Sequence, residues 1–353
     1  MAYTTIDDSS AHFQVKYWAG NDTQDTSHTF DGNSNLKPDL FINKGTGVAY
    51  GWNTMDTSRG IGDSGKVVRT NLGNAEFDIN DYFETADTNG FTVGSGDASF
   101  NSSSDNYICL AWKCNGGTTS SNTDGNSTTT VQANTTAGFS IVLGSFTGST
   151  QTYGHGLGVA PDVVFWKNRS NTNSWLWFTT AFDGTHDYGI LNQGNAFSAT
   201  SYDVPTSTVF YGNDDASTNF VAYCFKSIQG FSQFGGYAGS GGGGTNGTFV
   251  HTGFRPAFVM VKSVSTSANW QVYNNKRPSY GNNVNLKMGF NKENIENGSD
   301  FGNTSQNNLD FLSNGFRCTT ANTDTNSGGE TYLYWAVAEH PFVTSGGIPT
   351  VAR

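Results

Sequence analysis

The chain has 353 residues and a net charge of −11, and its 13% of charged residues is about half of what soluble domains usually carry. Aromatic residues make up 14%, which excludes global disorder because so many large rings can form a sizeable core. The 18 basic and 29 acidic residues form no basic stripe, so nucleic acid is not an expected partner. No apolar run approaches the ~18 residues of a membrane span, and the N-terminus lacks the features of a signal peptide.

Thr, Ser, Asn, Gly, Phe and Tyr dominate the sequence, whereas Leu, Lys, Glu and Met are sparse. This composition favours strands and tight turns over helices and predicts an all-β chain. Any helix is expected to be a short turn in the variable middle of a unit, for example near residues 78–85.

The first predicted elements set a pattern that recurs. A strand begins at Phe13, and a second, nearly continuous apolar strand follows Pro38 and ends at Lys44, where it is expected to meet solvent. Trp52 comes eight residues after that Lys and begins the next strand. An aromatic and β-branched strand over residues 107–113 closes the unit.

The same landmarks recur twice further along the chain. The second set is Phe139, Pro161, Lys167, Trp175 and a closing strand at 220–226, and the third is Phe231, Pro256, Lys262, Trp270 and a closing strand at 332–338. Within the second unit, a polar turn after Lys167 predicts a hairpin with Trp175 and Trp177 on one face. Because Trp52, Trp175 and Trp270 occupy equivalent strand positions, we expect them in the core.

The repeats predict three tandem antiparallel β-sandwich units with jelly-roll-like architecture. Unit 1 covers residues 1–117 with an N-terminal arm, a Ser/Thr/Asn/Gly-rich linker covers 118–138, unit 2 covers 139–228 and unit 3 covers 229–353. On this modular interpretation, residues 139–353 should fold alone. The Gly-rich run 239–247 is expected to be a loop tip, since no helix follows it to bind phosphate.

Residues that could carry chemistry are few. No histidine pair has metal-ligand spacing, and His28, His155 and His251, which precede the three prolines, are expected to have a structural or turn role. The glycines and histidine of 154–158 could form an oxyanion loop, but no nucleophile elbow accompanies them. Cys109 and Cys224 are expected to be buried hydrophobes, with a Cys109–Cys114 disulfide or metal clip as the alternative.

Loop acids leave two further alternatives open. A glycosidase would need two carboxylates at a defined separation, for which the candidates are Asp183, Asp187, Asp203, Asp214 and Asp215. Calcium could bind at residues 97–105 or at 213–215, although ordinary polar turns are the simpler interpretation. We therefore assign no catalytic, cofactor or metal residue from the sequence.

Aromatic residues beside Asn, Asp and Ser are typical of a shallow sugar-binding surface, where rings stack on the sugar. The candidates are the loop residues Tyr153, Tyr202, Tyr211 and Tyr280, and the ligand itself is not named by the sequence.

Several segments of the sequence are distinctive enough to compare with known families. They include residues 107–117, 121–125, 133–142, 154–158 and 161–169. On these segments the sequence resembles a recurring domain of unknown function found in marine tailed phages, often in tandem, in tail-fibre or virion structural proteins. Unit 1 departs from the pattern after Lys44, where Gly45 replaces the usual Asn, and unit 3 departs after Lys262.

The resemblance implies a non-enzymatic virion protein on the phage exterior, assembled in the host cytoplasm with other tail or capsid proteins. A tail fibre or receptor-binding component that recognises a host surface glycan is the first hypothesis. A capsid decoration or head fibre protein is the alternative, and a glycan depolymerase is a third. A homo-oligomer, with a trimer favoured, is the ordinary expectation for such proteins.

Overall fold

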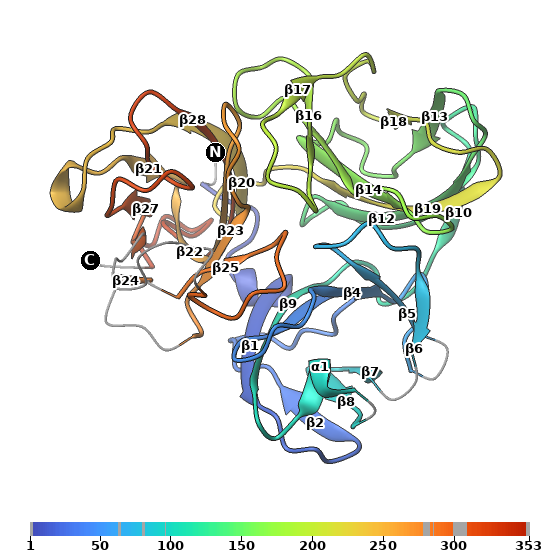
Figure 1. The fold of residues 1–353 in the computed structure, drawn as a ribbon, viewed down its shortest axis with the longest axis horizontal. Coiled ribbons are helices and arrows are strands. Elements are labelled where there is room, and N and C mark those ends of the chain that lie inside the picture. Colours follow the sequence, from blue (N-terminus) through green and yellow to red (C-terminus); the bar gives the residue numbers. More distant parts are fainter. Residues whose placement is uncertain are drawn as a thin grey trace.

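The computed structural model describes residues 3–62, 65–79, 82–95, 97–277, 283–284, 286–298 and 309–350. These residues form antiparallel sheets and very little helix, which confirms the predicted all-β class. Three lobes lie around a common centre, one for each repeat (Figure 1). Among the helices of the described residues, none is long and apolar enough to cross a membrane.

Unit 1 contains a larger and a smaller sheet. The larger sheet has the order β1 (Phe13–Ala19), β9 (Asn106–Trp112), β3 (Leu40–Gly45), β4 (Asn53–Asp56), β5 (Gly65–Arg69) and β6 (Phe77–Ile79). The smaller sheet has the order β2 (Thr26–Thr29), β8 (Gly90–Val93) and β7 (Phe83–Asp87). The short helices of its described residues include η1 (Ser9–Ala11) and α1 (Ala98–Asn101). The short helix expected in the variable middle of the unit is α1, and the example given at residues 78–85 is wrong, because β6 and β7 occupy its described part.

Unit 2 is built the same way with a wider main sheet. Its order is β10 (Ser120–Asn122), β11 (Thr129–Asn134), β12 (Phe139–Phe146), β19 (Thr218–Phe225), β14 (Val163–Asn168), β15 (Leu176–Thr179), β16 (Asp187–Ile190) and β17 (Ser198–Ala199). A second sheet pairs β13 (Gln151–Gly154) with β18 (Val209–Gly212). The predicted linker 118–138 thus contains two strands of this sheet, since its Thr and Val residues favour extended backbone.

Unit 3 repeats the arrangement again. Its main sheet has the order β20 (Ser232–Ala238), β28 (Thr331–Pro341), β22 (Phe254–Ser263), β23 (Gln271–Asn274) and β25 (Met288–Gly289). The second sheet has the order β21 (Phe249–His251), β27 (Gly315–Cys318), β26 (Leu309–Leu312) and β24 (Asn283–Val284), and η3 spans Gly244–Asn246. Pro256 lies inside β22 rather than before it, where the register shifts around it accommodate the missing N–H.

The hydrophobic core consists of one cluster shared by all three units and one further cluster inside each unit. The inner faces of the three main sheets meet in one central cluster, where Trp112 stacks on Trp335 with ring centroids 5.2 Å apart and Phe225 lies 4.8 Å from Trp335. Each of the other three clusters fills the space between the two sheets of one unit. Because the central cluster draws on all three units, each unit needs the other two to bury its inner face.

The three repeat tryptophans are fully buried, as predicted, and each donates its indole N–H across a unit boundary. The acceptors are main-chain carbonyls: Trp52 to Gly289 at 2.8 Å, Trp175 to Arg69 at 2.8 Å and Trp270 to Ile190 at 3.2 Å. Unit 1 therefore bonds to unit 3, unit 3 to unit 2, and unit 2 to unit 1. These bonds form a closed ring.

A second ring of main-chain hydrogen bonds joins the same boundaries. The amides of Glu76, Phe197 and Glu296 donate at 2.8–2.9 Å to the carbonyls of Arg169, Val264 and Thr46 respectively. Each acceptor lies two residues after a repeat lysine. The boundary between units 3 and 1 has no covalent connection, but there the N-terminal arm binds unit 3, with the Thr4 hydroxyl donating to Gln229 O at 2.7 Å.

Candidate functional site

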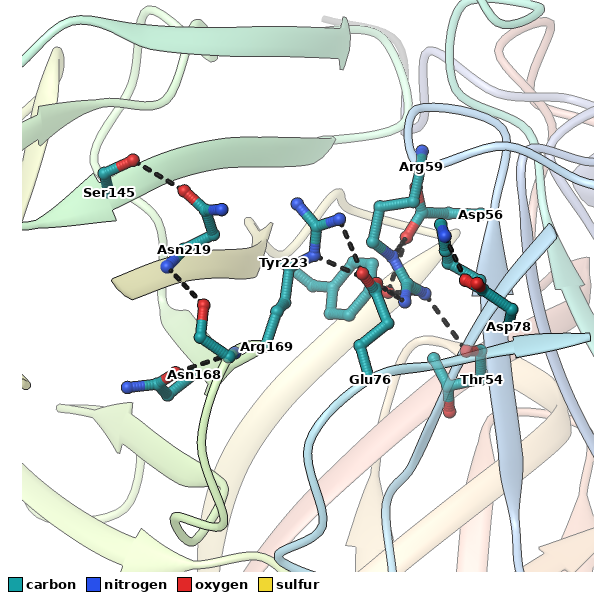
Figure 2. A network of polar contacts seen from close by, with 12 residues as sticks. Thr54, Asp56, Arg59, Glu76, Asp78, Ser145, Asn168, Arg169, Asn219 and Tyr223 are labelled. Atoms are coloured by element: carbon teal, nitrogen blue, oxygen red, sulfur yellow. Dashed lines mark hydrogen bonds and ion pairs between the residues drawn. The ribbon is translucent and has the colours of Figure 1, made fainter. Parts of the chain in front are cut away.

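An ion cluster lies at the boundary between units 1 and 2 (Figure 2). Arg59 and Asp56 have fully buried side chains joined at 2.5 Å, and a second Arg59 nitrogen donates to Glu76 at 2.9 Å. The third Arg59 nitrogen donates to Thr54 O at 3.0 Å and to the Tyr223 hydroxyl of unit 2 at 3.2 Å. One guanidinium thus serves two carboxylates and both units.

Arg169 of unit 2 completes the cluster. It binds Glu76 with two parallel hydrogen bonds of 2.9 and 2.7 Å, the bidentate geometry that suits a guanidinium and a carboxylate. Burial alone would raise the pKa of Glu76, but the hydrogen bonds and charges of Arg169 and Arg59 outweigh burial and lower it. Burial raises the pKa of Tyr223 well above its usual value, so this phenol stays protonated and donates to Asp56 at 2.8 Å.

The cluster recurs in unit 3 with two charged groups instead of four. Thr46 of unit 1 occupies the place of Arg169, two residues after the repeat lysine. Arg277, like Arg59, follows its repeat tryptophan by seven residues, and it binds Glu296 at 2.8 Å. Asn274 replaces Asp56 at the position four residues after the tryptophan. In unit 2 the equivalent residues are Phe182 and Phe197, whose rings meet edge to face at 5.5 Å. The charged groups of the two ion clusters neutralise one another and hold the sheets together, which is a structural role.

Arg169 also borders an exposed hollow of about 530 Å³. The hollow lies where the inner face of the unit 2 sheet extends past unit 1, over neighbouring strands β11, β12 and β19 and the end of β14. We call this surface the ledge, and its lining consists of Ser127, Thr128, Thr129, Thr130, Leu143, Gly144, Ser145, Thr147, Arg169 and Asn219. Hydroxyl and amide groups dominate it, and the Ser145 hydroxyl donates to Asn219 at 2.8 Å.

The ledge depends on the strands that composition predicts to be a linker. β10 and β11 extend the unit 2 sheet beyond β12, whereas β1 and β20 have no strand beyond them in the described parts of units 1 and 3. The period-two pattern of Thr129, Val131 and Ala133 could have indicated a strand. No pattern in the sequence indicates that its exposed side faces a hollow.

The repeat lysines correct one expectation. Lys44, Lys167 and Lys262 were expected where their strands meet solvent, but all three are at most 1% exposed. Their ammonium groups turn back to carbonyls of the following turn; for example, Lys167 donates to Asn171 O at 3.0 Å. Burial lowers the pKa of each lysine to about 8.

The aromatic residues predicted for sugar stacking do not form one surface. Tyr153 is fully buried against Phe146, Phe210 and Phe220, and this expectation is wrong because its ring fills the unit 2 sandwich. Tyr202 is half-buried against Phe178. Tyr211 is half-buried on β18, and Tyr280 lies outside the described residues.

Most of the candidate acids accept hydrogen bonds from nearby protein groups. Asp97 caps α1 through the Ser99 amide at 2.7 Å, Asp105 accepts from the Gly47 amide at 2.6 Å, and Asp214 accepts from the Asn173 side chain at 2.5 Å. The other candidates include Asp183 and Asp187, which both accept from Thr185, and Asp203, which is exposed. Over the parts of the chain that the structure describes, no three His, Cys, Asp or Glu residues are grouped to hold a metal ion.

The cysteines and histidines have structural places. All four cysteines are buried and free, so Cys109 and Cys114 form no disulfide, and burial raises the pKa of each thiol. His155 is fully buried in a turn, where its ring accepts from the Leu157 amide at 3.2 Å. His28 packs on Trp18, and His251 is an exposed residue of β21.

Comparison with known proteins gives one match. No curated protein and no solved structure matched the chain. A family model described as a domain of unknown function, DUF7483, matches residues 8–341. The match covers all three units and both rings of hydrogen bonds between them, so the family corresponds to the three-unit body and not to a single repeat. The chain belongs to the DUF7483 family.

Proposed function

We propose that this chain is a non-enzymatic structural protein on the exterior of a tailed phage. In this proposal it acts as a tail-fibre or receptor-binding component that recognises a glycan on the host surface. It assembles in the host cytoplasm with other virion proteins. The resemblance of its repeats to domains of phage tail-fibre proteins supports this context. The buried ion cluster, whose charges are paired, is consistent with a rigid scaffold.

The ledge is the observation that carries the glycan part of the proposal. Thr128, Thr130, Ser145 and Asn219 are exposed and lie on adjacent strands or, for Thr128, directly before one, so they present hydroxyls and an amide on a shallow surface. Sugars are bound through such groups, which donate and accept hydrogen bonds with sugar hydroxyls. Among the residues that the structure describes, no aromatic side chain lines the hollow. Recognition there rests on hydrogen bonds rather than on ring stacking.

The charge of the ledge limits the class of glycan that it can bind. Arg169 is the one charged residue in the described lining of the ledge, and Glu76 already holds that guanidinium through two hydrogen bonds. A carboxylated or sulfated sugar would have to compete with Glu76 for the same donors. A neutral glycan fits the ledge better.

Binding of the purified chain to host cells and to extracted surface glycans tests the proposal. The double variant Thr130→Ala/Asn219→Ala should bind about tenfold more weakly, since two lost hydrogen bonds amount to about 1.4 kcal/mol or more. Thr123→Ala, an exposed residue outside the ledge, is the matched control and should bind like the unsubstituted chain.

Other outcomes distinguish the alternatives. Host binding that the double variant leaves unchanged would remove the ledge as the glycan site. Release of reducing sugar from the glycan would indicate a depolymerase. Failure to bind any host glycan, together with capsids that lose stability when the protein is missing, would indicate a capsid decoration protein.

A further inference from the structure

A second hollow opens at the boundary between units 3 and 1, which has no covalent connection. It has a volume of about 170 Å³, and its lining includes Phe13, Gln14 and Val15 of β1 together with Asn275, Lys276 and His340 of unit 3. Three consecutive residues of one strand line it, although successive side chains point to opposite faces of a sheet. The hollow therefore runs along the edge of β1.

The equivalent place between units 1 and 2 is filled by a strand. There β11 pairs with β12, the counterpart of β1, and places Gln132 beside Ile141. The Gln132 amide donates to Thr57 at 3.1 Å and to Ser58 at 2.9 Å, across the unit boundary. Its carbonyl oxygen accepts from the amide of Asn115 at 2.9 Å.

The repeat relates those contacts to the hollow residue by residue. Thr57 and Ser58 follow Trp52 by five and six residues, as Asn275 and Lys276 follow Trp270. Ile141 follows Phe139 by two residues, as Val15 follows Phe13. A strand that paired with β1 as β11 pairs with β12 would thus place a side chain opposite Val15, facing Asn275 and Lys276.

The third boundary, between units 2 and 3, shows a different way to fill this place. Ala181 and Phe182, six and seven residues after Trp175, pack against the central core there, and the Phe182 main chain lies against Gly236 of β20. Two of the three equivalent boundaries are therefore occupied by the chain itself. The boundary beside β1 is occupied by no such residue in the described parts of the chain.

We propose that the edge of β1 binds an extended segment of another protein chain, which adds to the sheet as a strand and inserts a Gln side chain into the hollow. β1 is the outermost strand of its sheet among the described residues, and such an edge is a template for a further strand. The Asn275 side-chain oxygen is buried without a hydrogen-bond partner. It stands where Thr57 accepts the Gln132 amide in the filled boundary.

The charged residues that line the hollow also indicate that the inserted side chain of the bound segment is uncharged. Lys276 is paired with Asp31 at 2.8 Å, and Glu339 is paired with Arg255 at 2.6 Å. A charged side chain would disturb these pairs, whereas a neutral amide can donate to Asn275 without doing so. The preferred segment therefore resembles β11, in which Val131 and Ala133 flank an uncharged Gln.

A synthetic peptide with the sequence of residues 128–135 is a suitable probe. The full chain should bind it saturably, and hydrogen exchange of the amides in residues 13–17 should slow at least tenfold in the complex. The peptide with Gln132→Leu, and the chain variant Asn275→Ala with the unchanged peptide, should each bind about tenfold more weakly. Asn106→Ala, an exposed residue of β9, is the matched control.

A second experiment detects the peptide complex even if the free peptide binds weakly. The same peptide fused to the N-terminus through a flexible Gly/Ser linker has an effective concentration in the millimolar range. Slowed exchange at residues 13–17 in this fusion, but not in the Gln132→Leu fusion, supports the proposal. Unchanged exchange in both fusions, or binding that Asn275→Ala leaves unaffected, overturns it. Neither result depends on glycan binding at the ledge.

Discussion

Replacing Arg59 by Met would leave two carboxylates without their shared cation. The Met side chain keeps the aliphatic contacts of Arg59, but Asp56 would stay fully buried with only Tyr223 and the main-chain amide of residue 59 as donors. Removing one partner of a buried ion pair costs about 3–5 kcal/mol. The unfolding entropy of a chain of this length is about 0.7 kcal/mol/K, so the midpoint of thermal unfolding should fall by about 4–7 °C.

The repeat supplies a matched control for that loss. Arg277 is equally buried, but it faces one carboxylate, Glu296, which is 19% exposed and can regain water. Arg277→Met should therefore cost less, about 1–3 kcal/mol. Scanning calorimetry of both variants measures the difference, and Arg59→Met/Asp56→Asn should recover most of the loss. Equal losses for the two arginines, or no recovery in the double variant, would refute the assignment of the cost to an unpaired buried carboxylate.

Four further predictions follow from the described contacts. Burial lowers the pKa of Lys44 to about 8 in the folded chain, from the ordinary value of 10.5. The free energy of unfolding of the unsubstituted chain should therefore rise by up to about 3 kcal/mol relative to Lys44→Met as pH rises from about 8 to 10.5. A pH-independent difference between the two chains in urea unfolding would contradict this. Trp175→Phe, which removes the donor to Arg69 O and leaves a small void, should cost about 1–3 kcal/mol by the same measurement, and a loss below about 0.5 kcal/mol would show that this bond contributes little. Fragment 139–353 lacks the unit 1 share of the central core and should bind a hydrophobic dye and unfold without cooperativity, contrary to the modular expectation; a sharp transition would support that expectation. The buried thiols, whose pKa values are raised, should react with a thiol reagent only in denaturant, and fast labelling of the native chain would disprove their burial.

The sequence predicts the repeated strands well because each landmark has a local physical meaning. Phe13, Phe139 and Phe231 open or immediately precede the first strands, and the apolar runs after the prolines form strands covered on both faces. The core position of the tryptophans also followed from their equivalence. Local patterns are sufficient for these features, since strand periodicity and burial depend on neighbouring residues.

Contacts between units were beyond prediction because they join residues far apart in the chain. A lysine at the end of an apolar strand usually meets solvent, and only the following turn, which supplies carbonyl acceptors, explains the burial of Lys167. The strand β11 was predicted to be part of a linker because its composition is polar. The contacts of its Gln132 cross the boundary between units 1 and 2. The shared spacing of Arg59 and Arg277 was visible in the sequence, but its meaning depends on Glu76 and Glu296.

The proposed function is tested most directly by immunogold labelling of intact virions with antibody against this chain. A receptor-binding component should place gold at the tail tip or the tail fibres. Gold spread over the head would contradict the receptor-binding proposal in favour of a capsid decoration protein. Virions without any gold would contradict a place on the phage exterior altogether.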